Sequence, residues 1–380
     1  MSRVRTRSRQ SPRHGASARA LPPATALILA LVLVAGLLSI VGCDSADTTG
    51  VTTGPTGTTG TTTSETTPTT VTKVDKLTLV APPGPMAIPM AYMVVNDKLA
   101  DVAEETELVI WENADQLKAM VAGGQGDFVT VPSNSAAIFY NKGLELRLLD
   151  ISVWNITYLV TSDPTAAGFA DIEGQSLVVS LQGSVPDVMF QYLAAKEGLD
   201  PEEDFELRYA TDPTQAAQLL VAGEVENAVL SEALATAVLL QTKDAETPLR
   251  KALAFDEAWT AAAGGSTAGE SARTPIAGVV ATASVMDNPD VIAAFEREYA
   301  AAIEWMLADP EAAGQLVETE LPQLGLRAAV MTASLQSITW EHKSAAEAKA
   351  SLEAFYTALM ELSPEVIGGK LPDDAFYYAP

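Results

Sequence analysis

One order of elements occurs twice in this chain, and it restricts the fold more than any other feature of the sequence. Apolar, β-branched runs alternate with segments of helical periodicity, first over residues 76–153 and again over residues 177–230. Each unit reads strand, loop, helix, strand, helix and then a Gly-containing turn before another apolar strand. Strands that alternate with helices at this spacing predict βαβ units and parallel pairing. We therefore expect an α/β protein of two similar lobes, each a mostly parallel sheet flanked by helices.

The periodicity also predicts the individual elements. In the first unit we expect strands at 76–80, 107–111, 127–131 and 145–153, and helices at 88–103, at 114–122 and up to residue 141. In the second we expect strands at 177–181, 205–209 and 227–230, with helices at 183–198 and 214–222. A strand at 276–282 returns to the first lobe, and everything beyond is expected to be helical, including 290–307, 310–320 and 345–362. Two crossings between lobes would form a hinge. The aromatic strip Phe376–Tyr378 is expected to pin the C-terminus to the body.

The N-terminal segment has the pattern of an export signal. Its charged residues up to residue 42 are all Arg, and an apolar run from Ala26 to Val41 is too short for an ordinary spanning helix. The run ends in Ile40-Val41-Gly42-Cys43, which resembles the lipobox of bacterial lipoproteins. That resemblance implies a signal peptide over 1–42 and lipidation of Cys43; the alternative is an uncleaved anchor with an incidental Cys. Either way the body is expected outside the cytoplasm.

A Thr-, Gly- and Pro-rich stretch follows the expected anchor at Cys43. Such a composition has almost no apolar side chains to bury and does not offset the entropy cost of ordering. We expect a disordered tether over 43–73. The organisation expected for the rest is lobe 1 over 74–160, completed by 284–380, and lobe 2 over 161–283.

Composition excludes several classes of function. With 49 acidic against 23 basic residues the formal net charge is −26, which opposes binding to nucleic acid. The lone Cys excludes disulfides within the chain and Cys-based metal sites. Because His342 is the one His after residue 42, a His pair for a metal is missing. We therefore expect neither a metal site, nor a cofactor, nor a catalytic residue.

Ligands of open parallel sheets bind beyond the carboxyl ends of strands, where loops and helix N-termini present N–H groups. Four loops qualify, and each has an alternative reading as an ordinary turn or helix cap. A second group of candidates consists of aromatic side chains near the first crossing, which could stack on a flat ligand or pack at the hinge. The candidate ligand-binding residues are Pro85, Met86, Ser133, Asn134, Ser135, Trp154, Tyr158, Gly183, Ser184, Ser231 and Glu232.

The loops in this order resemble the substrate-binding proteins of ABC importers, in the group that handles nitrate, sulfonates, taurine and thiamine-precursor pyrimidines. The resemblance covers about residues 74–380 and rests on the stretches 131–143, 171–174, 222–232 and 367–372. Where the family has Glu-Pro, this chain has Glu232-Ala233. The resemblance implies a type II periplasmic-binding-protein fold whose lobes close on a small molecule.

The function implied is a lipid-anchored, monomeric solute receptor that delivers its ligand to an ABC permease and its ATPase, and that is not an enzyme. A sensory or adhesive lipoprotein and a pyrimidine-synthase-like enzyme are the alternatives, the enzyme being disfavoured by the single His. Few Arg and Lys residues lie near the four loops; Arg147 and Arg273 are the nearest. This scarcity favours a neutral or weakly charged ring compound over sulfonate or nitrate.

Overall fold

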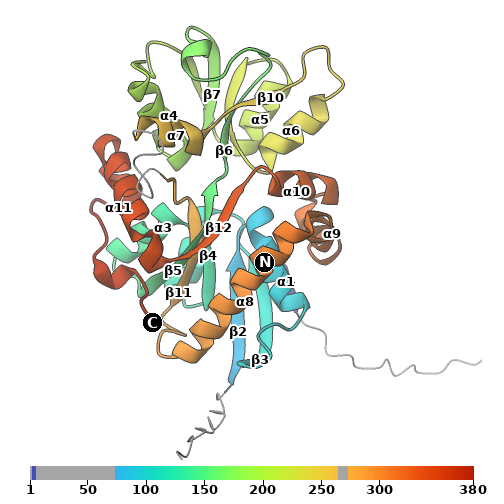
Figure 1. The fold of residues 1–380 in the computed structure, drawn as a ribbon, viewed down its shortest axis with the longest axis vertical. Coiled ribbons are helices and arrows are strands. Elements are labelled where there is room, and N and C mark those ends of the chain that lie inside the picture. The colour runs from blue at the N-terminus through green and yellow to red at the C-terminus, as the bar shows by residue number, and fades with distance from the viewer. Residues whose placement is uncertain (1, 6–72, 264–272) are drawn as a thin grey trace, which may run out of the picture. The chain divides into compact units, whose positions relative to one another are not determined.

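The computed structural model describes residues 2–5, 73–263 and 273–380. The predicted signal peptide, apart from residues 2–5, and the predicted tether with its predicted lipidation site Cys43, apart from Lys73, lie outside these ranges. Among the described helices, none has the length and apolar character needed to cross a bilayer. The structure has two sheets with helices on their faces (Figure 1).

The first sheet has the strand order β1-β3-β2-β4-β11-β5-β12. Pairing of β2 with β3 and with β4 is parallel, whereas β11 runs antiparallel between β4 and β5, and β12 runs antiparallel to β5. Its strands are β1 (Ser2–Arg5), β2 (Val74–Ala81), β3 (Ala103–Ile110), β4 (Phe128–Pro132), β5 (Leu146–Asn155), β11 (Ala277–Thr282) and β12 (Thr339–Ser344).

The second sheet has the order β10-β6-β9-β7-β8. Here β7 pairs in parallel with β8 and β9, while β6 is antiparallel to both β9 and β10. Its strands are β6 (Thr157–Thr161), β7 (Ser176–Ser180), β8 (Glu206–Ala210), β9 (Asn227–Ser231) and β10 (Arg250–Ala254). We call each sheet with its helices a lobe.

The helices follow the strands as the periodicity predicts. In the first lobe they are α1 (Ile88–Val95), α2 (Ala114–Ala122), α3 (Ser133–Asn141), α8 (Pro289–Ala308), α9 (Pro310–Glu320), α10 (Ala328–Leu335) and α11 (Ala345–Leu362). In the second they are α4 (Val185–Lys196), α5 (Pro213–Val221), α6 (Leu234–Thr242) and α7 (Phe255–Ala262). Short 3-10 turns lie at Pro85–Ala87, Ala170–Ile172, Pro322–Leu324, Pro364–Ile367 and Asp374–Phe376.

The two-lobed α/β prediction is confirmed, with one correction to the sheets. Both are mixed rather than mostly parallel. In the second sheet β6 runs antiparallel to β9 and β10. In the first sheet β11 enters from the side of the second lobe, with its first residue, Ala277, opposite Pro132 at the end of β4. A strand that enters at the end where β4 leaves must run against β4.

Other predictions also needed correction. The first helix ends at Val95 rather than near residue 103, because Asn96 bonds back to the Tyr92 carbonyl and Asp97 adopts a positive φ of 51°. The C-terminal region is not all helical, since β12 adds a strand to the first sheet. The predicted pinning of the C-terminus is confirmed: the Tyr378 N–H donates to the Leu148 carbonyl at 2.9 Å.

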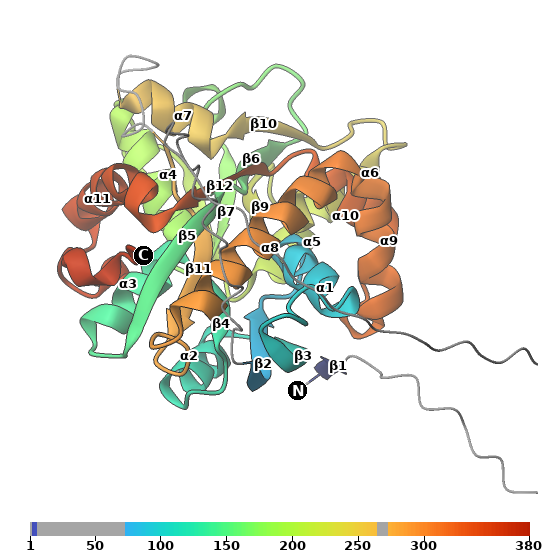
Figure 2. The same cartoon turned by 60° about the horizontal axis from the view of Figure 1, so that its bottom comes forward.

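The lobes are joined where β5 passes almost directly into β6, at residues 155–157. The chain returns ahead of β11, so both crossings lie a few residues earlier than the boundaries at 160 and 283 placed them. Only Ile156 separates β5 from β6, and no Gly or Pro marks the break in the sequence, which explains the first difference. Together with the turn 337–339 before β12, residues 153–157 and 273–277 form what we call the lobe junction (Figures 1 and 2).

Aromatic packing covers both faces of the first sheet. On one face α8 stacks Phe295 on Phe128 of β4, with ring centroids 3.9 Å apart. On the other face lies α11, whose Phe355 also meets Trp259 of α7 edge-on at 5.0 Å. The second contact joins a helix of each lobe, so the apolar core continues across one side of the junction.

Candidate lobe-junction site

The four predicted loops follow strand ends, as expected for an open α/β sheet. Pro85 follows β2, Ser133 follows β4, Gly183 follows β7 and Glu232 follows β9. Three of the four loops have contacts at the lobe junction. The fourth, after β7, has its described hydrogen bonds within its own lobe.

Ser133 holds the returning crossing against the first lobe. Its Oγ donates to the Pro275 carbonyl at 2.5 Å, and its N–H donates to the Ile276 carbonyl at 2.8 Å. The buried Tyr356 hydroxyl donates to the Ser133 carbonyl at 2.7 Å. Ser133 is 1% exposed. Its structural role is to hold the returning crossing and α11 against β4.

Its neighbours point in different directions. Asn134 donates from Nδ2 to the Val366 carbonyl at 3.1 Å, which ties α3 to the C-terminal segment. Ser135 is partly buried on the same helix. Pro85 is buried, while Met86 packs with Ile276 and Trp340 in a small apolar cluster at the junction. Of these four predicted residues, Met86 is the one that the structure brings to the crossings.

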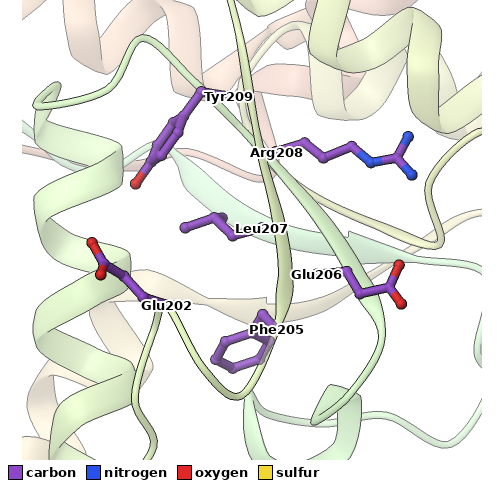
Figure 3. Close-up of a pocket in the computed structure, with 6 residues that line it drawn as sticks. All are labelled: Glu202, Phe205, Glu206, Leu207, Arg208 and Tyr209. Atoms are coloured by element: carbon purple, nitrogen blue, oxygen red, sulfur yellow. The ribbon is translucent and has the colours of Figure 1, made fainter.

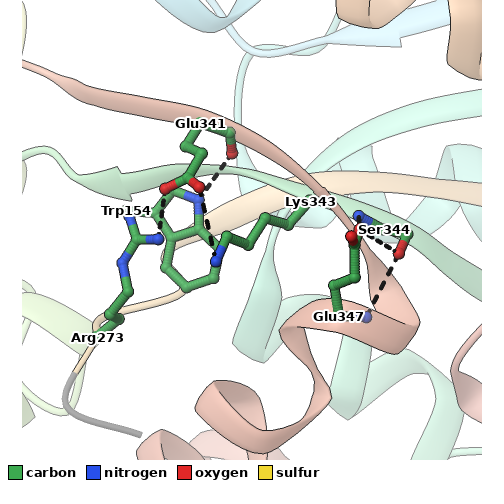
Figure 4. A network of polar contacts seen from close by, with 6 residues as sticks. All are labelled: Trp154, Arg273, Glu341, Lys343, Ser344 and Glu347. Carbon is green, nitrogen blue, oxygen red and sulfur yellow. Dashed lines mark hydrogen bonds and ion pairs between the residues drawn. The ribbon is translucent and has the colours of Figure 1, made fainter. Parts of the chain in front are cut away.

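Trp154 is covered by charged groups (Figure 4). Its ring is 1% exposed, its indole N–H donates to the Glu341 carbonyl at 2.8 Å, and the Arg273 guanidinium lies 4.0 Å from the ring centroid. The Glu341 carboxylate pairs with Arg273 and lies 3.6 Å from Lys343 Nζ. The ring therefore supports a cation–π contact in this conformation, and a ligand would have to displace Arg273 to stack on it.

A second polar network joins the two lobes directly. Lys251 of β10 pairs with Glu232 and donates to Ser337 Oγ at 2.7 Å. Tyr158 of β6 donates to the Ser337 carbonyl, and Lys251 Nζ lies 4.4 Å above the Tyr158 ring. Since Ser337 precedes β12, these bonds cross from the second lobe to the first. We call Tyr158, Glu232, Lys251 and Ser337 the junction cluster.

Burial controls the electrostatics of this cluster. The Glu232 side chain is fully buried; one oxygen pairs with Lys251, and the other has no hydrogen-bond partner among the described residues. Burial, assisted by the negative charge of Glu232, raises the pKa of Tyr158 well above its usual range, so the hydroxyl stays a donor. Nearby, burial raises the pKa of Asp256 although Thr339 Oγ1 donates to its carboxylate at 3.0 Å.

The remaining predicted residues lie in the second lobe. Ser231 Oγ is 3.2 Å from Thr157 Oγ1, next to the first crossing. The Gly183 N–H donates to Asp187 at 2.7 Å, and Ser184 Oγ donates to the Ser180 carbonyl at 3.0 Å. Gly183 has a φ of 77°, which explains a glycine at this turn. The loop is thus organised as the N-terminus of α4.

Sequence reasoning missed Lys251, Ser337 and Lys343. None of them follows a predicted ligand-binding loop, and Lys251 reaches the junction because β10 pairs with β6 at the sheet edge. The scarcity of basic residues near the four loops in the sequence therefore does not mean that basic residues are scarce at the site in space. The Lys and Arg side chains are present at the junction, but Glu232 and Glu341 pair with them.

A surface hollow elsewhere in the second lobe is a separate feature (Figure 3). It measures about 440 Å³ and lies along β8, at the opposite edge of the sheet from β10. Successive β8 side chains alternate between its sides, with Leu207 on one and Glu206 and Arg208 on the other. No predicted site residue lines it.

Several known proteins of similar structure belong to ABC transport systems or bind sulfonates. A structure of an ABC transporter protein from Parabacteroides distasonis shares 22% identity, with a TM-score of 0.64 over 82% of this chain and 99% of that chain. The periplasmic aliphatic sulphonate binding protein SsuA from Escherichia coli shares 16%, with a TM-score of 0.59 over 81% and 93%. The alkanesulfonate-binding protein SsuA from Xanthomonas axonopodis pv. citri, bound to MOPS, shares 14%, with a TM-score of 0.55 over 81% and 98%.

At the level of sequence, no family model matches the chain, and no curated protein matches it. The structural likeness extends over both lobes and nearly the whole length of each neighbour. The chain has the two-lobed fold of the periplasmic binding proteins of ABC importers.

Proposed function

We propose that the protein is an extracytoplasmic solute-binding protein that captures a small molecule between its lobes and delivers it to an ABC permease. The observation that carries this proposal is the lobe junction, where side chains of both lobes meet across two adjacent chain crossings. Crossings of this kind act as a hinge, and closure around a ligand expels water and strengthens polar contacts. Binding of this kind makes and breaks no covalent bond.

The junction cluster supports the proposed position of the ligand. Lys251 and Tyr158 of the second lobe reach Ser337 of the first through single hydrogen bonds. Opening of the lobes would exchange such bonds for contacts with water or solute at small net cost. The second Glu232 oxygen is positioned beside them to accept from a donor on a ligand.

For the ligand we favour a neutral or weakly charged ring compound. Each basic side chain at the junction already has a carboxylate: Lys251 has Glu232, and Arg273 and Lys343 share Glu341. A sulfonate would have to compete with these carboxylates. Because two of the structural neighbours are sulfonate-binding proteins, sulfonates are the comparison class in the test.

The N-terminal pattern supports an anchored receptor. Cleavage before Cys43 and lipidation of its sulfur would attach the body to the outer face of a cell membrane, and the Thr-rich stretch would let it reorient. Such an arrangement fits a monomeric receptor working beside a permease. Mass spectrometry of the purified mature protein would identify a diacylglyceryl group on Cys43.

The test is thermal unfolding of residues 73–380 against pyrimidines, thiamine, riboflavin, sulfonates, taurine and nitrate. A ligand held at 100 times its Kd adds about 2.7 kcal/mol of stability, which is readily measured. We expect a shift with one compound class, and no shift with any compound would argue against a solute receptor of this group.

A variant pair locates the ligand. Glu232→Gln keeps the size of the side chain and removes the charge, so it should weaken binding of the hit if the ligand lies at the junction. The control is Glu206→Gln, which alters an exposed carboxylate of β8 in the hollow of Figure 3. Ser133→Ala and Trp154→Ala are less suitable, because both side chains also hold the crossings together. Equal loss in both chosen variants would place the ligand elsewhere.

A further inference from the structure

Three ionisable side chains from separate segments meet inside the first lobe. Asp150 lies in β5, Glu296 in α8 and His342 in β12. One ligand atom from each lies within 4.8 Å of the others, and His342 Nε2 is 3.5 Å from Glu296 Oε2. We call these three residues the buried triad. It takes no part in the junction cluster.

The triad is short of hydrogen bonds. Asp150 is 0% exposed, and neither of its carboxylate oxygens has a hydrogen-bond partner among the residues that the structure describes. The same holds for Glu296 Oε1 and for His342 Nε2. A buried carboxylate without donors costs several kcal/mol, so proteins normally bond it or place it on a cation. The Asp150 carboxylate oxygens are therefore available to coordinate a cation.

Local backbone geometry brings the three groups together. The register of β12 on β5 shifts between Trp340 and Lys343, so His342 lies in an irregular stretch next to Asp150. On the other side of β5, the register of β11 shifts as well, and Gly278 permits close approach to the Asp150 carbonyl. Irregular pairing of this kind re-aims side chains and is common beside functional sites.

We propose that Asp150, Glu296 and His342 bind a divalent transition-metal ion, with zinc as the best chemical match. One imidazole and two carboxylates form a donor set that zinc accepts, whereas calcium and magnesium prefer oxygen alone. In a tetrahedral site with bonds of ~2.1 Å, neighbouring ligand atoms are about 3.4 Å apart. The 3.5 Å between His342 Nε2 and Glu296 Oε2 agrees with that edge.

The burial of the three side chains determines from which side a metal ion could reach the triad. The His342 and Glu296 side chains are 22% and 21% exposed, so an ion and one water ligand would enter from their side while Asp150 closes the inner side. A bound ion would link β5, α8 and β12. Because β12 also carries Glu341 and Lys343 of the Trp154 network, the site would stiffen the first lobe at the junction.

The test measures zinc binding by the full chain in detergent, without an affinity tag and after treatment with EDTA. Calorimetric titration with ZnCl₂ should give one ion per chain, and zinc at 100 times its Kd should raise the Tm by about 4 °C. Titration with Co²⁺ should give the visible absorption of tetrahedral coordination. Failure of the protein to bind either ion would overturn the proposal.

Variants assign the ion to the triad. Asp150→Asn and His342→Gln should abolish the one-to-one site, while Glu298→Gln should keep it, because this partly buried carboxylate two residues further along α8 pairs with Arg297 and lies outside the triad. Retention of the site in either triad variant would contradict the assignment. If Asp150→Asn does not fold, His342→Gln decides alone, because that side chain is partly exposed and its replacement leaves the core filled.

Discussion

The molecule contains two buried charged clusters that differ in how their charges are satisfied. In the junction cluster, Lys251 neutralises Glu232 and also donates to Ser337 and Thr236, so one cation serves acceptors of both lobes. In the buried triad, two carboxylates and a single His face one another with several atoms unbonded among the described residues. The comparison shows two arrangements of buried charge. At the hinge an acid is paired with a lysine, whereas inside the first lobe two acids and a His have free ligand atoms among the described residues.

The pKa values of Asp150 and His342 in the triad are both raised. Burial, with the negative charge of Glu296, raises the pKa of Asp150 well above its usual range. Burial opposes a charge on His342, but the nearby carboxylates of Glu296 and Asp150 outweigh it and raise the pKa of His342 to about 9. The cation of the triad is thus an imidazolium, which loses its proton when it binds a metal ion, whereas the cation of the junction cluster is the Lys251 ammonium.

The largest effect is expected on breaking the complete pair. Glu232→Ala leaves Lys251 mostly buried without its carboxylate and should destabilise the protein by about 3 kcal/mol. Urea unfolding at pH 7 measures the change, with Glu361→Ala at the exposed end of α11 as control. A cost equal to that of the control would show that the pair contributes nothing and would remove the contrast between the clusters.

A steric change beside the triad comes next. A Cβ at residue 278 would lie 1.9 Å from the Asp150 carbonyl oxygen, so Gly278→Ala must push β11 away from β5. We expect a loss of about 2 kcal/mol. Gly124→Ala serves as a comparison, since its Cβ would meet no atom within 4 Å, although its φ of 61° adds strain. If Gly278→Ala were the milder of the two, the close approach at Asp150 would not be a constraint.

Asp150→Asn should have a much smaller effect than Glu232→Ala when metal is removed with EDTA. The change puts a neutral amide in place of a buried carboxyl group whose oxygens have no described donor and whose ionisation is opposed by burial, so we expect a gain of up to about 1 kcal/mol. Chemical unfolding in EDTA measures it. A loss comparable to that of Glu232→Ala would mean that Asp150 is paired in the folded protein.

The smallest effect concerns pH at the junction. Because burial raises the pKa of Asp256 in the folded state, the unfolded chain ionises first as the pH rises through about 3.9. Stability linked to this group is therefore greatest at low pH and is lost as the pH rises. The Asp256→Asn variant has no carboxyl group to ionise, so its free energy of unfolding should rise relative to that of the wild type between pH 4 and pH 7. The expected rise is less than about 1 kcal/mol. A difference that stays constant over this range would show that Asp256 ionises normally.

Local patterns predicted most of the elements well. The helix at 345–362 begins with a Ser344–Glu347 capping box (Figure 4), and such a local signal can be read without knowledge of the fold. The strand β12 was missed because Thr339–Ser344 is rich in polar and charged residues, and it pairs as an edge strand only after β5 is in place. The early end of α1 depends on Asn96 and Asp97, which the apolar periodicity concealed.

For the candidate site, chain position predicted which loops follow strand ends but not which polar groups they meet. Ser133 was expected to face a ligand, and the structure gives its hydroxyl to the Pro275 carbonyl. Lys251 lies 19 residues beyond Glu232 and was not considered, although the two form the central ion pair. Pairings between distant segments have no local signal.

The sequence by itself determined the α/β class, the repeated unit, the acidic character and the order of the elements, because these depend on periodicity and composition over short windows. Only the tertiary structure decided where charges meet. Asp150, Glu296 and His342 come from three segments that share one interior because β11 and β12 complete the first sheet on either side of β5. Long-range strand pairing sets those distances, and a short window of sequence contains no information about them.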